Sequence, residues 1–197
     1  MEWALDVPMY FIARGDRYEP GDGTTFRQFM EKGRAGLEAT PADWNRHLGS
    51  VFPDVRLKNI IEVRGADAVP PDLTCSLPAL WKGLLYDADA RTAARDLLGG
   101  ASSAECCAGR GDVARRGLAA QMAGRPVLEL ATELAEISRA GLRRIAHAGR
   151  TDPDETGYLE PVMAQLERAA SPGQVVLECW EGEWRRSVDR LIDYARY

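Results

Sequence analysis

The chain has 197 residues, of which 45% are hydrophobic, which is enough for one domain with its own buried core. Its formal net charge is −5 with the two signs interspersed, and this argues against nucleic acid as a partner, because phosphate backbones need a basic surface. The longest apolar stretch is interrupted, and no signal segment precedes the first strand, so we expect a cytoplasmic protein that does not bind a membrane.

Local signals in the first fifty residues predict one strand and two helices. Residues 5–13 form a β-type run followed by glycine-rich turns. Thr24 or Thr25 can cap a short helix that starts at Phe26. A second helix is expected from Thr40 and Pro41, and Pro53 ends it.

Residues 55–64 have alternating apolar positions and predict a central strand that ends in a Gly-Ala-Asp turn. Glu62 and Arg64 lie two residues apart on this strand, so both side chains should point to the same face. A carboxylate and a guanidinium in one cleft can hold a divalent cation and a phosphate together. The alternative is an ordinary ion pair on a solvated strand, which stabilises little.

The remainder of the chain is expected to be helical. Ser76 should cap a helix over 77–86, Asp87 should cap one over 88–98, and Pro126 opens the clearest apolar stripe. After a loop at 149–155, a further apolar stripe predicts a helix over 158–166. Its apolar residues are Tyr158, Leu159, Val162, Met163 and Leu166. The sequence Ser171-Pro172-Gly173 then introduces the last helical segments. The predicted class is α+β with few antiparallel strands and a predominantly helical C-terminal part, in a single domain over 1–197. Residues 1–75 would carry the sheet and residues 76–197 the helices.

Six segments occur in an order that resembles one enzyme family. They read ALDVPMYF, TFRQFM, DW..HL..VFP.VRLK, E.RGAD, LPALW.GLLYD and EGEW..SVD, and they are densest between Asp43 and Asp87. Together they resemble glutamate-cysteine ligase of the plant and proteobacterial type. The family enzyme is longer, so this chain corresponds to its C-terminal portion, and the N-terminal half of the active site is expected to be absent.

The resemblance implies a fold, a reaction and roles for four residues. The strands would be part of a funnel-like sheet of the glutamine synthetase-like, carboxylate-amine ligase type. With ATP and Mg²⁺, the side-chain carboxylate of glutamate would be phosphorylated, and the amine of cysteine would then attack the acyl phosphate to give γ-glutamylcysteine, the first step of glutathione biosynthesis. Glu62 would bind the metal and Arg64 the substrate or the γ-phosphate, whereas Asp22 and Thr24 lie in a segment that borders the amino-acid pocket.

Other interpretations remain open. Asp67 could reach the metal, but an aspartate in this position is more often a turn residue. The altered segment 69–73 would also suit a related ligase that joins another amine. In the ligase interpretation the chain is a truncated copy of the family enzyme. Alternatively, it is a non-catalytic fragment or subunit that needs a separate N-terminal half. The partners left open are that separate half and a second copy of this chain in a homo-oligomer.

Overall fold

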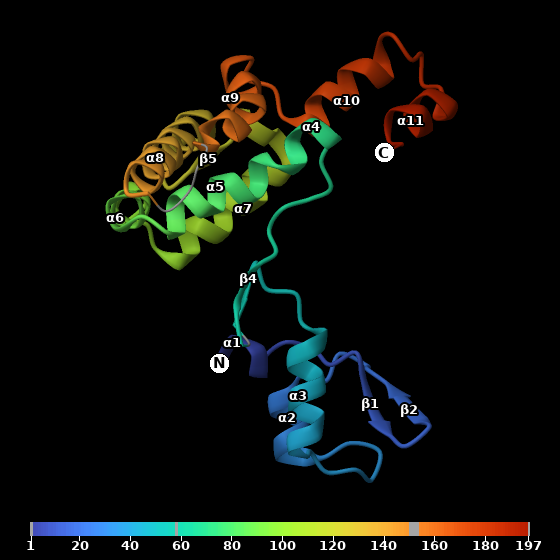
Figure 1. The fold of residues 1–197 in the computed structure, drawn as a ribbon. Helices are drawn as coiled ribbons and strands as arrows, with labels where there is room; N and C mark the ends of the chain where they lie inside the picture. The colour runs from blue at the N-terminus through green and yellow to red at the C-terminus, as the bar shows by residue number, and fades with distance from the viewer. Residues whose placement is uncertain (1, 58, 150–153, 197) are drawn as a thin grey trace. The chain divides into compact units, whose positions relative to one another are not determined.

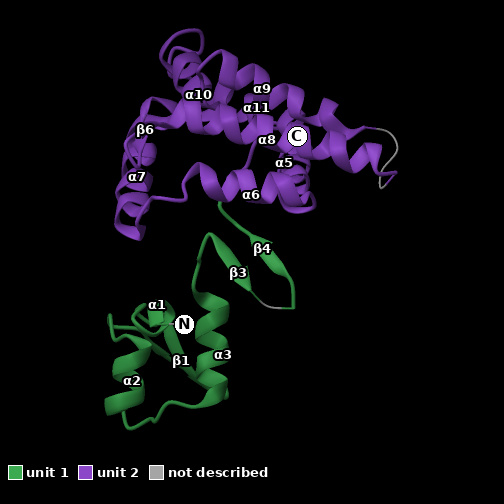
Figure 2. Cartoon of the chain, turned by 90° about the vertical axis from the view of Figure 1, so that its left-hand side faces the viewer, with its two compact units in different colours: residues 1–66 green, residues 67–197 purple. Residues whose placement is uncertain are grey.

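The computed structural model describes residues 2–57, 59–149 and 154–196, and it divides the chain into two compact units, Met1–Ala66 and Asp67–Tyr197. Figure 1 shows the elements along the chain and Figure 2 colours the two units. Helices predominate, and within the described ranges the strands form three separate two-stranded antiparallel sheets. The expected mixture of helices with a few antiparallel strands is therefore confirmed.

The described residues of the first unit form three helices and two hairpins. They are α1 (Glu2–Leu5), β1 (Phe11–Arg14), β2 (Arg17–Pro20), α2 (Phe26–Lys32), α3 (Pro41–Ser50), β3 (Val55–Leu57) and β4 (Ile61–Val63). A small core of Met9, Ile12, Phe26 and Phe29 holds β1 against α2. Thr25 and Thr40 each cap their helix through a reciprocal capping box, which confirms the predicted starts of α2 and α3.

The second unit is a helical assembly. It consists of α4 (Pro71–Thr74), α5 (Ser76–Leu85), α6 (Ala88–Leu97), α7 (Ser103–Arg116), η1 (Gly117–Ala119), β5 (Gln121–Met122), β6 (Arg125–Pro126), α8 (Val127–His147), η2 (Glu155–Leu159), α9 (Glu160–Glu167), α10 (Pro172–Glu181) and α11 (Val188–Tyr194). Helix α8 is the centre of this unit, because α5, α6, η2 and α9 all contact it. Its core residues are Ala79, Ala135, Leu142, Leu159, Met163 and Leu166. None of the helices in the described ranges has the length and apolar character needed to cross a membrane.

Three local predictions are wrong. Leu5 ends a short helix, and the strand expected over 5–13 starts only at Phe11. The strand expected over 55–64 is a hairpin, because the chain reverses after Leu57, where Asn59 supplies a residue that favours turns. Lys58 in that strand and residues 150–153 of the predicted loop lie outside the described residues.

Ser76 is the third correction. It is the first residue of α5 rather than its cap, and its hydroxyl donates a hydrogen bond to the Tyr158 carbonyl 2.7 Å away. The side chain therefore ties α5 to η2 instead of satisfying a free amide at the start of its own helix. Asp87, in contrast, caps α6 as expected, with its carboxylate accepting from the amide of Ala90.

Asp43 links the β1–β2 hairpin to the start of helix α3. Its buried carboxylate accepts hydrogen bonds from Arg14 Nη1 at 2.6 Å and Nη2 at 2.8 Å, and from the Thr40 hydroxyl at 2.6 Å. Burial acts to raise the pKa of Asp43, but the hydrogen bonds from Arg14 and Thr40 outweigh it, so the pKa lies below its ordinary value.

Asp43→Ala is expected to lower the free energy of unfolding by about 2 kcal/mol at pH 7, because it leaves Arg14 without its carboxylate partner and removes the α3 capping box. Since a lowered pKa contributes stability only while the group is ionised, the difference from wild type should shrink as the pH falls below the ordinary value of 3.8. Urea unfolding at several pH values measures this difference in the free energy of unfolding between wild type and Asp43→Ala. Glu31→Ala, at an exposed position of α2, is the matched control, and a pH-independent difference would contradict the assignment.

Candidate functional site

Glu62 lies on the β3–β4 hairpin between two arginines. The strand register places Arg56 of β3 directly opposite Glu62 of β4. Arg56 Nε donates to Glu62 Oε2 over 2.8 Å, and Arg56 Nη2 forms an ion pair with the same oxygen at 2.7 Å. Arg64, two residues after Glu62, brings its Nε to 3.9 Å from Glu62 Oε1. Among the described residues of the hairpin, Arg56, Glu62 and Arg64 thus form a cluster, and these three groups carry a combined formal charge of +1.

Arg64 is held mainly by the backbone and by a ring. Its amide donates to the Asp54 carbonyl over 2.7 Å, which extends the ladder beyond β4. The guanidinium lies over the ring of Phe52, 4.9 Å from the centroid, in a cation–π contact. Nη1 of Arg64 is buried and has no hydrogen-bond partner among the residues that the structure describes. A buried donor without a partner is costly, and a phosphate or carboxylate oxygen would satisfy it.

These residues fit a phosphate better than they fit a free metal ion. The structure shows no group of three or more His, Cys, Asp or Glu side chains positioned to bind a metal in its described ranges. Glu62 is therefore a single hard oxygen ligand beside two positive charges. Mg²⁺ in nucleotide sites commonly uses one or two carboxylates together with phosphate oxygens and water. The cluster is compatible with a metal ion that arrives with its polyphosphate.

Asp22 and Thr24 form a separate group at the start of α2. The Asp22 Oδ1 atom accepts hydrogen bonds from the hydroxyl and the amide of Thr24, and Oδ2 lies 3.4 Å from Arg34 Nε. The hydrogen bond from the Thr24 hydroxyl, with the backbone amide and Arg34, holds the pKa of Asp22 below its ordinary value. The structure therefore brings Asp22 to Thr24, and Glu62 to Arg64, in two groups on different elements.

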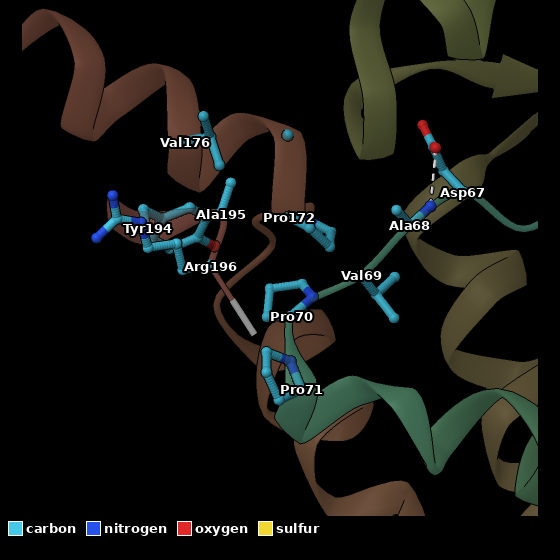
Figure 3. Close-up of a pocket in the computed structure, with 11 residues that line it drawn as sticks. Asp67, Ala68, Val69, Pro70, Pro71, Pro172, Val176, Tyr194, Ala195 and Arg196 are labelled. Carbon is cyan, nitrogen blue, oxygen red and sulfur yellow. Dashed lines mark hydrogen bonds between the residues drawn. The ribbon is translucent and has the colours of Figure 1, made fainter. Parts of the chain in front are cut away.

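Asp67 begins the second unit and has a local role. Its Oδ1 accepts from the next amide, Ala68 N, over 2.8 Å. Figure 3 shows Asp67 at the margin of a cavity of about 470 Å³ between the segment 67–71 and helices α10 and α11. Pro70, Pro71, Val176 and Tyr194 give this cavity mostly apolar walls. The described residues that line it do not include the four predicted site residues.

Arg56 is the site residue that the sequence reasoning missed. A signal was present, because Asn59 lies midway between Arg56 and Glu62 and favours a turn. In a single strand over 55–64, Arg56 would lie six residues from Glu62 and out of its reach, whereas the hairpin makes Arg56 the direct cross-strand partner of Glu62.

Comparison with known proteins agrees with the resemblance. The sequence model of "Glutamate-cysteine ligase family 2" matches residues 1–193. Relatives include the chloroplastic glutamate–cysteine ligase A of Oryza sativa subsp. indica, 36% identical over 200 residues, and the chloroplastic enzyme of Arabidopsis thaliana, 36% identical over 204 residues. The chloroplastic enzyme of Solanum lycopersicum is 33% identical over 201 residues.

The relatives are much longer than this chain. Each alignment covers all of this chain but only 39%, 37% and 37% of the three relatives, respectively. The expectation of a cytoplasmic protein is contradicted by the relatives' names, each of which describes a chloroplastic protein. The match of the family model over nearly the whole length shows that the chain belongs to glutamate-cysteine ligase family 2.

Proposed function

We propose that this chain takes part in the ATP-dependent ligation of the glutamate side-chain carboxylate to the amine of cysteine, the first step of glutathione biosynthesis. The observation that carries the proposal is the Arg56–Glu62–Arg64 cluster in a chain of this family. The relatives are named glutamate–cysteine ligases, and such a ligase must bind a transferable phosphoryl group.

In this proposal Arg64 holds a phosphate oxygen, because its planar guanidinium has an unsatisfied buried donor. Glu62 supplies an oxygen to Mg²⁺, which would neutralise charge on the phosphates when bound with the nucleotide. Asp22 and Thr24 border the amino-acid pocket, where their mutual hydrogen bonds fix the loop that precedes α2. The chain's residues position the reactants and compensate charge.

The same proposal extends to the architecture. The two units would form parts of one ligase catalytic domain, and the hairpins would be edges of a larger funnel-like sheet of the glutamine synthetase-like type. Among the strands that the structure describes, β3 and β4 pair only with each other, and this supports the proposal, since a two-stranded pair alone is marginally stable in water.

Glu62→Gln tests the metal assignment. Wild type should bind ATP more tightly with Mg²⁺ than without it, and the variant should lose this difference, with affinity for Mg²⁺·ATP falling by about tenfold or more. Isothermal titration calorimetry with and without Mg²⁺ measures both. Glu31→Gln, at an exposed position of α2, should behave as wild type. Nucleotide affinity that still depends on Mg²⁺ in Glu62→Gln would remove Glu62 from the metal site.

A second candidate is a non-catalytic part of a composite enzyme. It is favoured by the apolar side chains that the hairpin region exposes: Leu57 is 79% exposed, and Phe52, Ile60 and Ile61 are similarly open. Such a patch is typical of a surface that another segment covers. We propose that catalysis then requires the part of the relatives' length to which this chain does not correspond.

Phosphate release from ATP separates the two candidates. The chain would be assayed with glutamate and cysteine, with each amino acid omitted in turn, and with or without the N-terminal segment of the Arabidopsis thaliana relative added as a separate polypeptide. Release by the chain alone that depends on both amino acids supports a sufficient active site. Release only after the segment is added supports the composite enzyme.

A further inference from the structure

We propose that Arg56 is a positioning residue that holds Glu62 away from Arg64, so that the guanidinium of Arg64 stays available to an anion. The inference rests on the proposed function, which assigns the phosphate to Arg64. It adds a role for a residue on the opposite strand, which would not need to contact nucleotide, metal or substrate.

The distances show which arginine Glu62 prefers. Both donors of Arg56 lie within hydrogen-bonding distance of Oε2, at 2.8 and 2.7 Å, whereas Arg64 Nε is 3.9 Å from Oε1. The second distance is beyond the range of a hydrogen bond. Glu62 is thus paired with Arg56 and only near Arg64.

The hairpin explains this preference. Directly opposed residues of an antiparallel pair have adjacent Cβ atoms, and the register makes Arg56 the direct partner of Glu62. The Arg56 side chain is 19% exposed, so water competes little for its donors. Arg64 is turned instead toward the ring of Phe52 and keeps one buried donor without a described partner.

Removal of Arg56 would change both geometry and charge. Glu62 would lose the hydrogen bond from Arg56 Nε and the ion pair with Nη2, and Arg64, on the same strand, already lies 3.9 Å away. A short side-chain movement would then form a direct Glu62–Arg64 pair, which would occupy the guanidinium. The formal charge of the cluster would fall from +1 to zero, which disfavours a polyphosphate.

The ligand-free chain provides the decisive test, by NMR of arginine Nε–H groups. The Arg64 signal, assigned through its loss in Arg64→Lys, should move in Arg56→Gln and return toward its wild-type position in Arg56→Gln/Glu62→Gln. Arg56→Lys, which keeps the charge, should give a smaller displacement. Arg17→Gln on β2, which breaks an ion pair with Glu19 in the same unit, is the matched control and should leave Arg64 unchanged.

An unmoved Arg64 signal in Arg56→Gln and in Arg56→Lys would overturn the inference. So would a displacement that persists in the double variant, because a general disturbance of the hairpin would not be rescued by removal of the carboxylate. Backbone amide spectra of each variant establish that the hairpin is folded. If Arg56→Gln does not fold, Arg56→Lys is compared with Arg56→Lys/Glu62→Gln instead. A displacement of the Arg64 signal in the single variant that is reversed in the double variant supports the inference, and any other result overturns it.

Binding of inorganic tripolyphosphate without Mg²⁺ gives a second readout. Arg56→Gln should weaken it by about tenfold, and Arg56→Gln/Glu62→Gln should restore it to about the wild-type affinity. Absence of tripolyphosphate binding to the wild-type chain would count against the proposed phosphate site, whereas the NMR displacement would still decide whether Arg56 holds Glu62. The failure of one proposal is therefore distinguishable from the failure of the other.

Discussion

Gly141→Ala is expected to destabilise the helical unit by about 3 kcal/mol, because α5 and α8 meet with almost no space between their backbones. A Cβ atom at Gly141 would lie 2.1 Å from the Gly83 carbonyl oxygen and 3.1 Å from the Ala90 Cβ. The obstructing atom belongs to a helix backbone and cannot rotate away. The two helices would have to separate, which would loosen the core around Leu142.

Gly83, on the α5 side of the contact between α5 and α8, also has almost no free space around it. A Cβ at Gly83 would lie 2.3 Å from both the carbonyl oxygen and the hydroxyl of Ser138, which is fully buried and donates to the Leu80 carbonyl over 2.8 Å. Separation of the helices would therefore also break this hydrogen bond and leave a buried hydroxyl without its partner.

Urea unfolding followed by circular dichroism measures the effect of Gly141→Ala. Gly111→Ala in α7 is the matched control, since the nearest described atom to its Cβ would be 3.8 Å away on a flexible arginine side chain. That control should gain about 0.5–1 kcal/mol from helix propensity. Equal stabilities of the two variants would mean that α5 and α8 do not approach each other as closely as the structure has them.

Arg64→Ala is expected to reduce affinity for Mg²⁺·ATP and for tripolyphosphate by about a hundredfold, because it removes the charge and the fork of donors at once. Arg64→Lys should recover only part of this loss, since an ammonium group cannot reproduce planar two-point contact with phosphate oxygens. Isothermal titration calorimetry with both ligands measures the series. Arg17→Ala on β2 serves as a control for charge alone, and its affinity should match wild type.

An Arg64→Lys variant with full wild-type affinity would show that only charge is needed there. An Arg64→Ala variant with unchanged affinity for both ligands would exclude Arg64 from the proposed phosphate site. The two results lead to different conclusions. Full affinity in Arg64→Lys would keep the hairpin as the proposed binding element, whereas unchanged affinity in Arg64→Ala would mean that Arg64 of the hairpin does not bind the phosphate.

The parts of the fold that the sequence predicts are the ones set by neighbouring residues. Thr25, Thr40 and Asp87 cap their helices as expected, because a cap is formed within four residues of the chain. The apolar stripe that begins at Val127 likewise gives α8. Ser76 was misassigned because its partner is Tyr158, which is far away in sequence.

In the candidate site, too, the features set by neighbouring residues are predictable from the sequence, and those set by a chain reversal are not. The proximity of Glu62 and Arg64 follows from strand geometry over two residues, and the pairing of Asp22 with Thr24 is equally local. The role of Arg56 depends on a chain reversal that the alternating pattern of 55–64 conceals. The close contact of Gly83 with Gly141 was also invisible, because a glycine in a helix does not reveal which backbone it faces.

The shortness of β3 and β4 has a consequence for how the site responds to ligands. Strands of three residues joined in an isolated pair have few protecting hydrogen bonds, so their amides should exchange with solvent deuterium early, whereas the amides of α8 should exchange late. A ligand that joins Glu62 to Arg64 would be bound by a weakly protected part of the first unit. Slowed deuterium uptake confined to the described residues of 55–64 would then reveal binding of the proposed ligand without any turnover.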